Sequence, residues 1–398
     1  MIIRENYLKL LIAFKDKAVI KVITGIRRSG KSTLLLQFID YLKKSEIDHK
    51  AIIYINLESL EYDSIRDYRK LYELIAQKIS KNNHSYIFID EVQNVEEFEK
   101  AVNSLSIDFD VDIYLTGSNA YMLSSEISTL LSGRYVEINM LPLSFKEYRS
   151  QWLQEDKETT FNRYMKYGGF PFLAKETNEN IINNYLDGIY NTVVLKDVIK
   201  RNNVKDINLL ENILKMVLSS VGSLISPHSI SKMLKNEGKR VTNETVEKYI
   251  EMFCNAFILD KAVRFDIKGK AYLKTLNKYY ISDLGLRNNL LGYRQIEVTH
   301  ALENIIYYEL IRRGYKVDIG KVNQNEIDFI ARKNDKLEYY QVSYSVNQSK
   351  ETIERELKPF HQIADHYQKY LITMDKDYIT DFNGITKINA LEWLLNEK

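Results

Sequence analysis

The stretch Gly25-Ile26-Arg27-Arg28-Ser29-Gly30-Lys31-Ser32 lies between an apolar run at residues 19–24 and an amphipathic run at residues 32–43. It matches the pattern G-x-x-x-x-G-K-[ST], in which glycines let successive backbone N–H groups point at phosphate oxygens. The run that follows predicts a helix whose N-terminus favours the same anion. We therefore expect a strand, a phosphate loop (P-loop) and a helix in this order.

The polar residues of this loop have defined roles at a nucleoside triphosphate. Lys31 is expected to reach the β- and γ-phosphates, and the Ser32 hydroxyl to bind Mg²⁺. The expected cofactors are thus ATP and Mg²⁺. Three roles are open for Arg27 and Arg28: contact with phosphate, contact with a partner, or exposure to solvent. The predicted nucleotide-binding residues are Gly25, Arg28, Ser29, Gly30, Lys31, Ser32, Thr33 and Ser118.

A second motif, Tyr86-Ile87-Phe88-Ile89-Asp90-Glu91, is an apolar strand that ends in two carboxylates. A carboxylate leaving a buried strand is costly without a partner. Beside a phosphate loop, Asp90 is expected to help hold Mg²⁺, and Glu91 to orient and deprotonate the attacking water.

Two further segments carry candidate catalytic residues. Leu115-Thr116-Gly117-Ser118-Asn119 follows a predicted strand, so Asn119 or Ser118, with Thr116 as a lesser candidate, would sense the γ-phosphate; a plain helix cap is the alternative. Arg134, in Ser132-Gly133-Arg134, would stabilise transition-state charge in its own subunit or in a neighbour's. A surface arginine is the alternative, and action on a neighbour requires a homo-oligomer.

The hydrophobic pattern predicts an α/β fold. Apolar runs at residues 19–24, 51–57, 86–90, 111–116 and 135–139 alternate with amphipathic stretches. Continuous apolar runs indicate strands buried on both faces, as in a parallel sheet covered by helices. Changes in pattern predict four segments: an ATPase domain at 1–150, a helical connection at 151–205, a winged helix at 206–293 and an α/β domain at 294–398.

The composition is that of an ordinary globular protein. Of 398 residues, 45% are hydrophobic and 28% are charged. The 56 basic residues nearly balance the 54 acidic ones, so the net charge by itself does not indicate a nucleic-acid or membrane partner. Apolar runs stay below the ~18 residues of a membrane helix. The single cysteine, Cys254, excludes an internal disulfide. We expect a cytoplasmic protein without a membrane partner.

With these motifs, the chain resembles a family of prokaryotic AAA-type ATPases, over essentially its whole length. The resemblance implies a AAA-like sheet, a winged helix and a carboxyl-terminal domain similar to restriction endonucleases. It rests on the motifs above and on four more: Leu141-Pro142-Leu143-Ser144-Phe145, Tyr167-Gly168-Gly169-Phe170-Pro171, Lys278-Tyr279-Tyr280-Ile281-Ser282-Asp283-Leu284-Gly285-Leu286-Arg287 and Glu326-Ile327-Asp328-Phe329-Ile330-Ala331.

The pattern at residues 229–282 predicts helix, turn, helix and a two-stranded wing. Between Gly222 and Tyr280 there are 11 Lys/Arg and 6 Asp/Glu, which favours double-stranded DNA as a partner. Three glutamates on the second helix favour a protein partner instead. The residues expected to meet phosphate are Lys239, Arg240, Lys248, Lys268 and Lys270.

The carboxyl-terminal segment departs from the nuclease pattern. Glu303 and Asp328 fit the two carboxylates of such a site, and Glu326 offers another. However, Gln341 stands where a second strand carboxylate is expected, and Ser343 where a lysine is expected. Since metal and lysine both stabilise developing charge, we expect a degenerate site without cleavage.

Three functions follow from these patterns. The leading one is an ATPase whose nucleotide cycle switches the winged helix and the carboxyl-terminal domain on DNA or on a protein partner. The alternatives are an ATP-gated nuclease and a module that binds ATP without significant hydrolysis.

Overall fold

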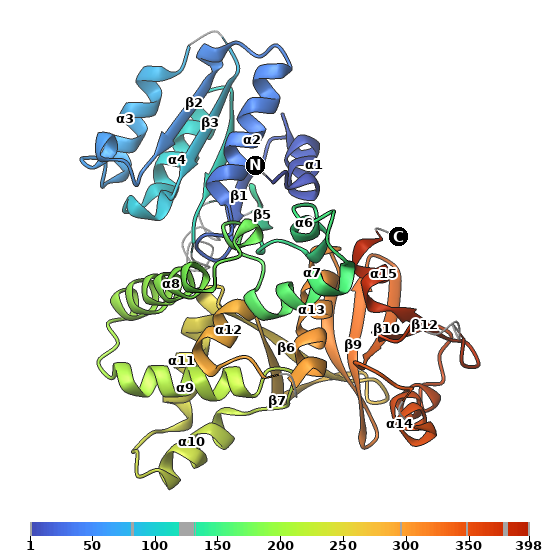
Figure 1. The fold of residues 1–398 in the computed structure, drawn as a ribbon. Coiled ribbons are helices and arrows are strands. Elements are labelled where there is room, and N and C mark those ends of the chain that lie inside the picture. Colours follow the sequence, from blue (N-terminus) through green and yellow to red (C-terminus); the bar gives the residue numbers. More distant parts are fainter. Residues whose placement is uncertain are drawn as a thin grey trace. The chain divides into compact units, whose positions relative to one another are not determined.

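The computed structural model of the protein describes residues 2–80, 83–118, 131, 133–294, 297–347, 349–376 and 381–396 (Figure 1). The chain forms two compact units. The first contains residues 1–142 and 255–257, and the second contains residues 143–254 and 258–398.

The first unit is built on a five-stranded parallel sheet in the order β2-β3-β4-β1-β5. This confirms the α/β class and the five strands predicted from the apolar runs. Every residue of the interior strand β1 is buried, as expected for a strand covered on both faces. The strands are β1 (Ile20–Thr24), β2 (Ile52–Asn56), β3 (Ser85–Asp90), β4 (Val111–Thr116) and β5 (Tyr135–Asn139).

Helices cover both faces of this sheet (Figure 1). On one face, Leu34 and Phe38 of α2 pack in a core with Phe88 of β3. On the other face, Leu71 of α3 and Val102 of α4 share a second core with strand residues. Alternate strand side chains enter the two cores. The helices are α1 (Glu5–Phe14), α2 (Lys31–Lys44), α3 (Tyr68–Lys78) and α4 (Phe98–Asp108), with short 3-10 turns at His49–Ala51, Leu60–Tyr62 and Val92–Asn94.

The second unit begins with helices, as the pattern of residues 151–205 predicts. Polar residues precede most of them and accept hydrogen bonds from first-turn N–H groups; Asp156, Asn178 and Ser226 are examples. Among the described residues, every helix is too short or too polar to cross a bilayer. The helices and turns of this part are α6 (Phe145–Arg149), α7 (Lys157–Tyr167), a 3-10 turn (Leu173–Lys175), α8 (Glu179–Tyr190), a π-helix (Asn191–Lys200), α9 (Ile207–Ser219), α10 (Pro227–Asn236) and α11 (Asn243–Asn255).

A seven-stranded mixed sheet in the order β12-β11-β10-β9-β8-β6-β7 completes the second unit. Its strands are β6 (Leu259–Asp266), β7 (Ala271–Ile281), β8 (Lys316–Val322), β9 (Asn325–Lys333), β10 (Lys336–Val342), β11 (Gln368–Thr373) and β12 (Ile385–Asn389). The accompanying helices are α12 (Leu284–Leu291), α13 (Val298–Arg312), α14 (Lys350–His361) and α15 (Ala390–Leu395).

One strand pairing joins two segments that the sequence pattern separates. The order α10, α11, β6, β7 is the one expected for a helix-turn-helix with a wing. Strand β6 also pairs in parallel with β8, through Arg264 opposite Ile319. The expected wing therefore belongs to the same sheet as the strands after residue 294, while the four-segment division stays a prediction.

Two of the quoted motifs interlock in this unit. The Asp283 carboxylate, which precedes α12, accepts hydrogen bonds from the backbone N–H groups of Gly285 (2.8 Å) and Gly169 (2.6 Å). Gly168 has φ +79°, and a Cβ built on it would lie 1.9 Å from an Asp283 carboxylate oxygen. Close approach of Asp283 thus explains the glycine at position 168, whereas a Cβ on Gly169 would lie 2.6 Å from the Leu143 carbonyl oxygen.

Replacing Asp283 with alanine should destabilise the second unit. The change leaves the Gly169 and Gly285 N–H groups buried without an acceptor and removes a helix cap, at a combined cost of about 2–4 kcal/mol. Both tryptophans, Trp152 and Trp393, lie in this unit. Urea unfolding followed by tryptophan fluorescence therefore reports on it selectively.

The variant Asp283→Asn separates hydrogen bonding from charge. Burial raises the pKa of Asp283 to about 7. Stability from this residue is thus present at low pH and is lost as pH rises from about 4 through 7, because only the unfolded carboxyl gives up its proton in that window. Asp283→Asn should remove this part of the pH dependence; an unchanged pH profile would contradict it.

Candidate nucleotide-binding site

The phosphate loop leaves the carboxyl end of β1 in a conformation that only glycine permits. Gly25 has φ +138°, and a Cβ built there would lie 2.2 Å from the Met140 carbonyl oxygen. Gly30 has φ +102° and immediately precedes α2. These positions explain the two glycines that the motif requires. The loop thereby places the first turn of α2, with its N–H groups, next to the end of β1.

Lys31 folds back over this loop. Its Nζ donates to the carbonyl oxygens of Gly25 (3.0 Å) and Ile26 (3.2 Å), and the residue is buried. Ser32 and Thr33 of the same helix turn are half-buried, whereas Arg28 is exposed. Among the described contacts, the buried Ser29 hydroxyl has no hydrogen-bond partner. A buried hydroxyl without a partner, in a loop whose glycines let backbone N–H groups point at an anion, fits a phosphate site. The bound anion would supply the missing hydrogen bonds.

Asp90 and Glu91 are joined through Thr116. The Thr116 hydroxyl donates to Asp90 Oδ1 and accepts from the backbone N–H of Glu91 at 2.9 Å. The Tyr54 hydroxyl donates to Asp90 Oδ2 at 3.1 Å. Burial, together with the neighbouring Asp90, raises the pKa of Tyr54, so its hydroxyl remains a donor. Asp90 is therefore held from both sides at the end of β3.

Strand register brings these carboxylates toward the phosphate loop. Ile23 of β1 lies opposite Thr116 of β4, and Ile89 of β3 lies opposite Leu115. The carboxyl ends of β3, β4 and β1 are consecutive along one edge. At about 4.8 Å per strand, β3 and β1 are roughly 10 Å apart, a distance that a phosphate group with its cation can fill.

Gln93 is a contact of Glu91 that the sequence reading missed. Its side-chain amide donates to Glu91 Oε2 and lies 3.5 Å from the Ser118 hydroxyl. Glu91 itself has φ +54° and is buried. Ser118 and Glu91 thus share Gln93 as a neighbour. Asn119 and Ser132 lie outside the described residues, and a γ-phosphate-sensing role for Ser118, Asn119 or Thr116 stays a prediction.

Arg4 is a second residue that no motif indicates. Its guanidinium donates to the carbonyl oxygens of Ser29 (3.0 Å) and Leu141 (2.7 Å), and only 2% of the residue is exposed. Arg4 therefore ties the phosphate loop to the segment that follows β5. A lone arginine after two isoleucines carries no pattern, so only the folded chain reveals this contact.

Arg134 lies at the opposite edge of the sheet. It directly precedes β5, and its carbonyl oxygen accepts from the N–H of Ile20, where β1 begins. The five residues of β1 span roughly 17 Å, which separates Arg134 from the phosphate loop. A role at the site of its own subunit is therefore wrong, because parallel strands place their two ends at different edges. A role at a neighbouring subunit stays a prediction.

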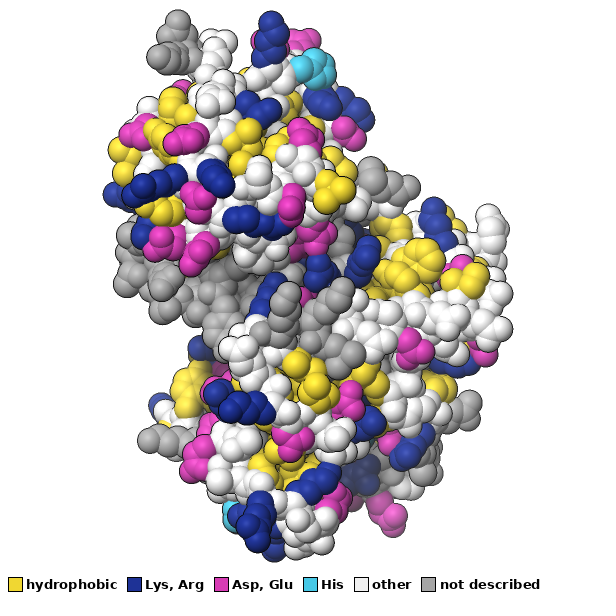
Figure 2. Space-filling model, turned by 90° about the vertical axis from the view of Figure 1, so that its left-hand side faces the viewer, with side chains coloured by type: hydrophobic (Ala, Val, Ile, Leu, Met, Phe, Trp, Pro, Cys, Tyr) yellow, Lys and Arg dark blue, Asp and Glu magenta, His cyan; other side chains and the backbone are white. Residues whose placement is uncertain are grey.

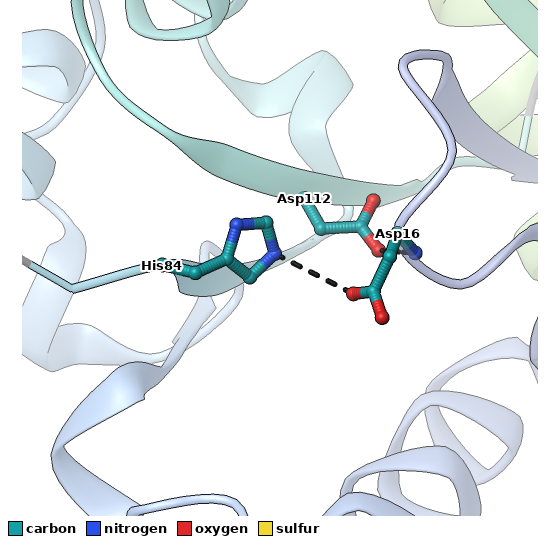
Figure 3. A group of neighbouring side chains, drawn as sticks. All are labelled: Asp16, His84 and Asp112. Atoms are coloured by element: carbon teal, nitrogen blue, oxygen red, sulfur yellow. Dashed lines mark hydrogen bonds and ion pairs between the residues drawn. The ribbon is translucent and has the colours of Figure 1, made fainter.

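The same amino edge holds a group of possible metal ligands, Asp16, His84 and Asp112 (Figure 3). His84 Nε2 lies 3.6 Å from Asp16 Oδ1. Lys21, which is buried, pairs with Asp112, and Lys15 pairs with Asp16. The negative charges of Asp16 and Asp112 are thus already balanced by the two lysines. A metal cation gains little electrostatic attraction at this position. A cavity of about 410 Å³ at this edge is lined by His84, Asp112 and Arg134, among others.

The nuclease-like residues of the second unit lie near one another. Glu303 of α13 and Asp328 of β9 both contact Lys278 of β7. The Gln341 side-chain oxygen accepts from the Asp328 N–H (3.3 Å). The Ser343 hydroxyl donates to the carbonyl oxygen of Ser345 (3.3 Å). Neither Gln341 nor Ser343 supplies an acid or a cation, as expected, but the sequence reading missed Lys278.

The expected DNA-binding surface carries both signs of charge. Four of the five expected phosphate-contacting residues are exposed: Arg240, Lys248, Lys268 and Lys270. The fifth, Lys239, places its Nζ 3.9 Å from Glu237 Oε2. Helix α11 has three exposed glutamates beside Lys248: Glu244, Glu247 and Glu251. Figure 2 likewise shows Lys and Arg side chains interspersed with Asp and Glu on the face it draws.

Known proteins share both the sequence and the fold. The family described as AAA domain matches residues 17–149, and a domain of unknown function matches residues 158–297. An uncharacterized protein of Haemophilus influenzae is 44% identical over 402 residues, which cover 99% of each chain. An uncharacterized protein of Methanocaldococcus jannaschii is 32% identical over 86% of this chain and 78% of its own.

A solved structure supports the fold. The Walker-type ATPase of Pyrococcus abyssi has a TM-score of 0.52 at 15% identity and covers 73% of this chain and 96% of its own. At this identity the likeness concerns the fold alone. The AAA-domain match, the two relatives and the phosphate loop show that the chain belongs to a family of prokaryotic AAA-type P-loop ATPases.

Proposed function

We propose that this protein binds ATP with Mg²⁺ at the phosphate loop and hydrolyses it. The observation that carries the proposal is the Thr116 hydroxyl, which joins Asp90 to the backbone of Glu91 on the strand beside β1. This contact holds the Asp90 carboxylate and the backbone of Glu91 with one side chain, and Gln93 donates to the Glu91 carboxylate itself. A module that only binds ATP has no need for a fixed Glu91.

The residues of the site fit a phosphate group and its cation. Lys31 and the N–H groups of the loop and of α2 would bind the phosphates, and Ser32 and Asp90 would hold Mg²⁺. When bound, the ion would withdraw charge from the phosphate oxygens. Glu91 would orient the attacking water and accept its proton, and Gln93 would fix the Glu91 carboxylate before the phosphates arrive.

The nucleotide cycle would serve a partner through the second unit. Double-stranded DNA and a protein are the two candidates. The exposed glutamates of α11 favour a protein, because a helix with three acidic residues beside one lysine repels phosphate. An ATP-gated nuclease has less support, since Gln341 and Ser343 lack the charges that cleavage needs. Cytoplasmic location remains part of this proposal.

The pair Lys31→Ala and Glu91→Gln tests the assignment of the site. Loss of the Lys31 ammonium should weaken ATP binding at least about tenfold, because a phosphate contact is lost. Glu91→Gln should keep ATP affinity and lower kcat by roughly 10²–10⁴, the usual contribution of a general base. Fluorescent-nucleotide titration and phosphate release measure the two effects; full turnover by either variant contradicts the assignment.

Thr116→Val tests the carrying observation. The valine is isosteric but can neither donate to Asp90 nor accept from Glu91, so kcat should fall about 10- to 100-fold while ATP affinity changes little. Thr116→Ser is the matched control and should retain most of the wild-type kcat. Equal losses in the valine and serine variants would show that packing, rather than the hydroxyl, matters.

Turnover measured with and without double-stranded DNA, across a salt series, identifies the partner. Stimulation that fades as salt rises would indicate phosphate contacts. The charges of α11 lead us to expect no such stimulation. If stimulation does occur, Lys268→Ala with Lys270→Ala should reduce it without affecting basal turnover, and the partner would be DNA.

A further inference from the structure

Lys278 of β7 is buried at the centre of three carboxylates. Its Nζ lies 2.7 Å from Glu326 Oε1, 2.9 Å from Glu303 Oε1 and 3.4 Å from Asp328 Oδ1. Only 4% of the lysine side chain is exposed. We name these four residues the Lys278 cluster. The three acids are those that resemble a nuclease metal site, so the ammonium stands where such a site would bind its cation.

The lysine remains charged in this environment. Burial favours the neutral amine, but Glu303 and Asp328 outweigh it, and the pKa of Lys278 lies above its usual value. The carboxylates respond in different directions: the pKa of Glu303 is lowered despite burial, chiefly by Lys278, whereas burial and Glu303 raise the pKa of Asp328 to about 7. Ammonium and carboxylates thus compensate one another away from solvent.

The oxygens that a metal would use are already hydrogen-bonded. Glu303 Oε1 accepts from the Tyr280 hydroxyl at 2.6 Å in addition to Lys278. Asp328 Oδ2 accepts from the backbone N–H of Val342 at 2.9 Å. Mg²⁺ requires about six oxygen ligands at roughly 2.1 Å and keeps several waters. Lys278 Nζ lies within 3.4 Å of an oxygen of each carboxylate, so the ammonium occupies the position that the ion would take.

We propose that the Lys278 ammonium is the built-in cation of this cluster and closes it to divalent metals. The second unit is then no metal-dependent nuclease in its native form, but it contains a latent metal site. Removing the lysine charge would open that site to a hard divalent ion such as Mn²⁺, held by Glu303, Glu326 and Asp328. This inference does not depend on ATP hydrolysis by the first unit.

Mn²⁺ titration of the full, nucleotide-free chain tests the proposal, with binding followed by calorimetry or electron paramagnetic resonance. Lys278→Ala removes both the charge and the side chain that lies between the carboxylates, and it should gain one site at least tenfold tighter than any in the wild type. Adding Asp328→Asn should abolish the gain. Lys278→Arg keeps a cation, and Lys261→Ala changes an exposed lysine on neighbouring β6; neither should gain a site.

A second comparison needs no lysine variant. Wild type and Asp328→Asn should bind Mn²⁺ equally, and neither should cleave DNA or RNA with Mg²⁺ or Mn²⁺. An Asp328-dependent metal site or cleavage activity in the wild type would overturn the proposal, and so would a folded Lys278→Ala protein that gains no site. A Lys278→Ala protein that unfolds in EDTA and refolds with Mn²⁺ would support it. If that variant folds under neither condition, the wild-type comparison decides.

Discussion

Parallel pairing of β1 with β4, and of β4 with β3, is the constraint on which the nucleotide site depends. Parallel strands end at the same edge, so the loop after β1 and the carboxylates after β3 come together although more than fifty residues separate them. Thr116, at the end of the strand between, bonds both Asp90 and the backbone of Glu91 with one hydroxyl. The same constraint sends Arg134 to the other edge, because that residue precedes its strand.

In each unit, several buried charged groups share their hydrogen-bond and ion-pair partners. In the first unit, Asp90 takes hydrogen bonds from two neighbouring strands, through Tyr54 and Thr116. In the second, Asp283 holds a glycine turn from a distant motif, and Lys278 balances three acids. A buried charge without a partner costs several kcal/mol, so each set ties together segments that are far apart in sequence.

The second unit shows how a fold and an activity separate. Its sheet brings Glu303 and Asp328 to one point, as a nuclease site would, yet the cation at that point belongs to the protein itself. The Lys278 ammonium balances the charge of the carboxylates, but it cannot activate a water molecule as a bound metal ion does. The pairing of β6 with β8 makes this contact possible, since it places the β6–β7 hairpin in the same sheet as β9.

The sequence by itself determined the local features: the phosphate loop, the two carboxylates at the end of a strand, and the five strands of the first sheet. These are readable because glycine φ angles, strand burial and motif spacing are set within a few residues. Only the tertiary structure decided the rest. Arg4, Gln93 and Lys278 act through contacts that no periodicity encodes, and the distance of Arg134 from the phosphate loop of its own subunit follows from the pairing of β5 with β1. Residues that are far apart in the sequence come into contact only when the strands are paired in register. Buried charges and buried hydrogen-bonding groups therefore gain their partners only in the folded chain.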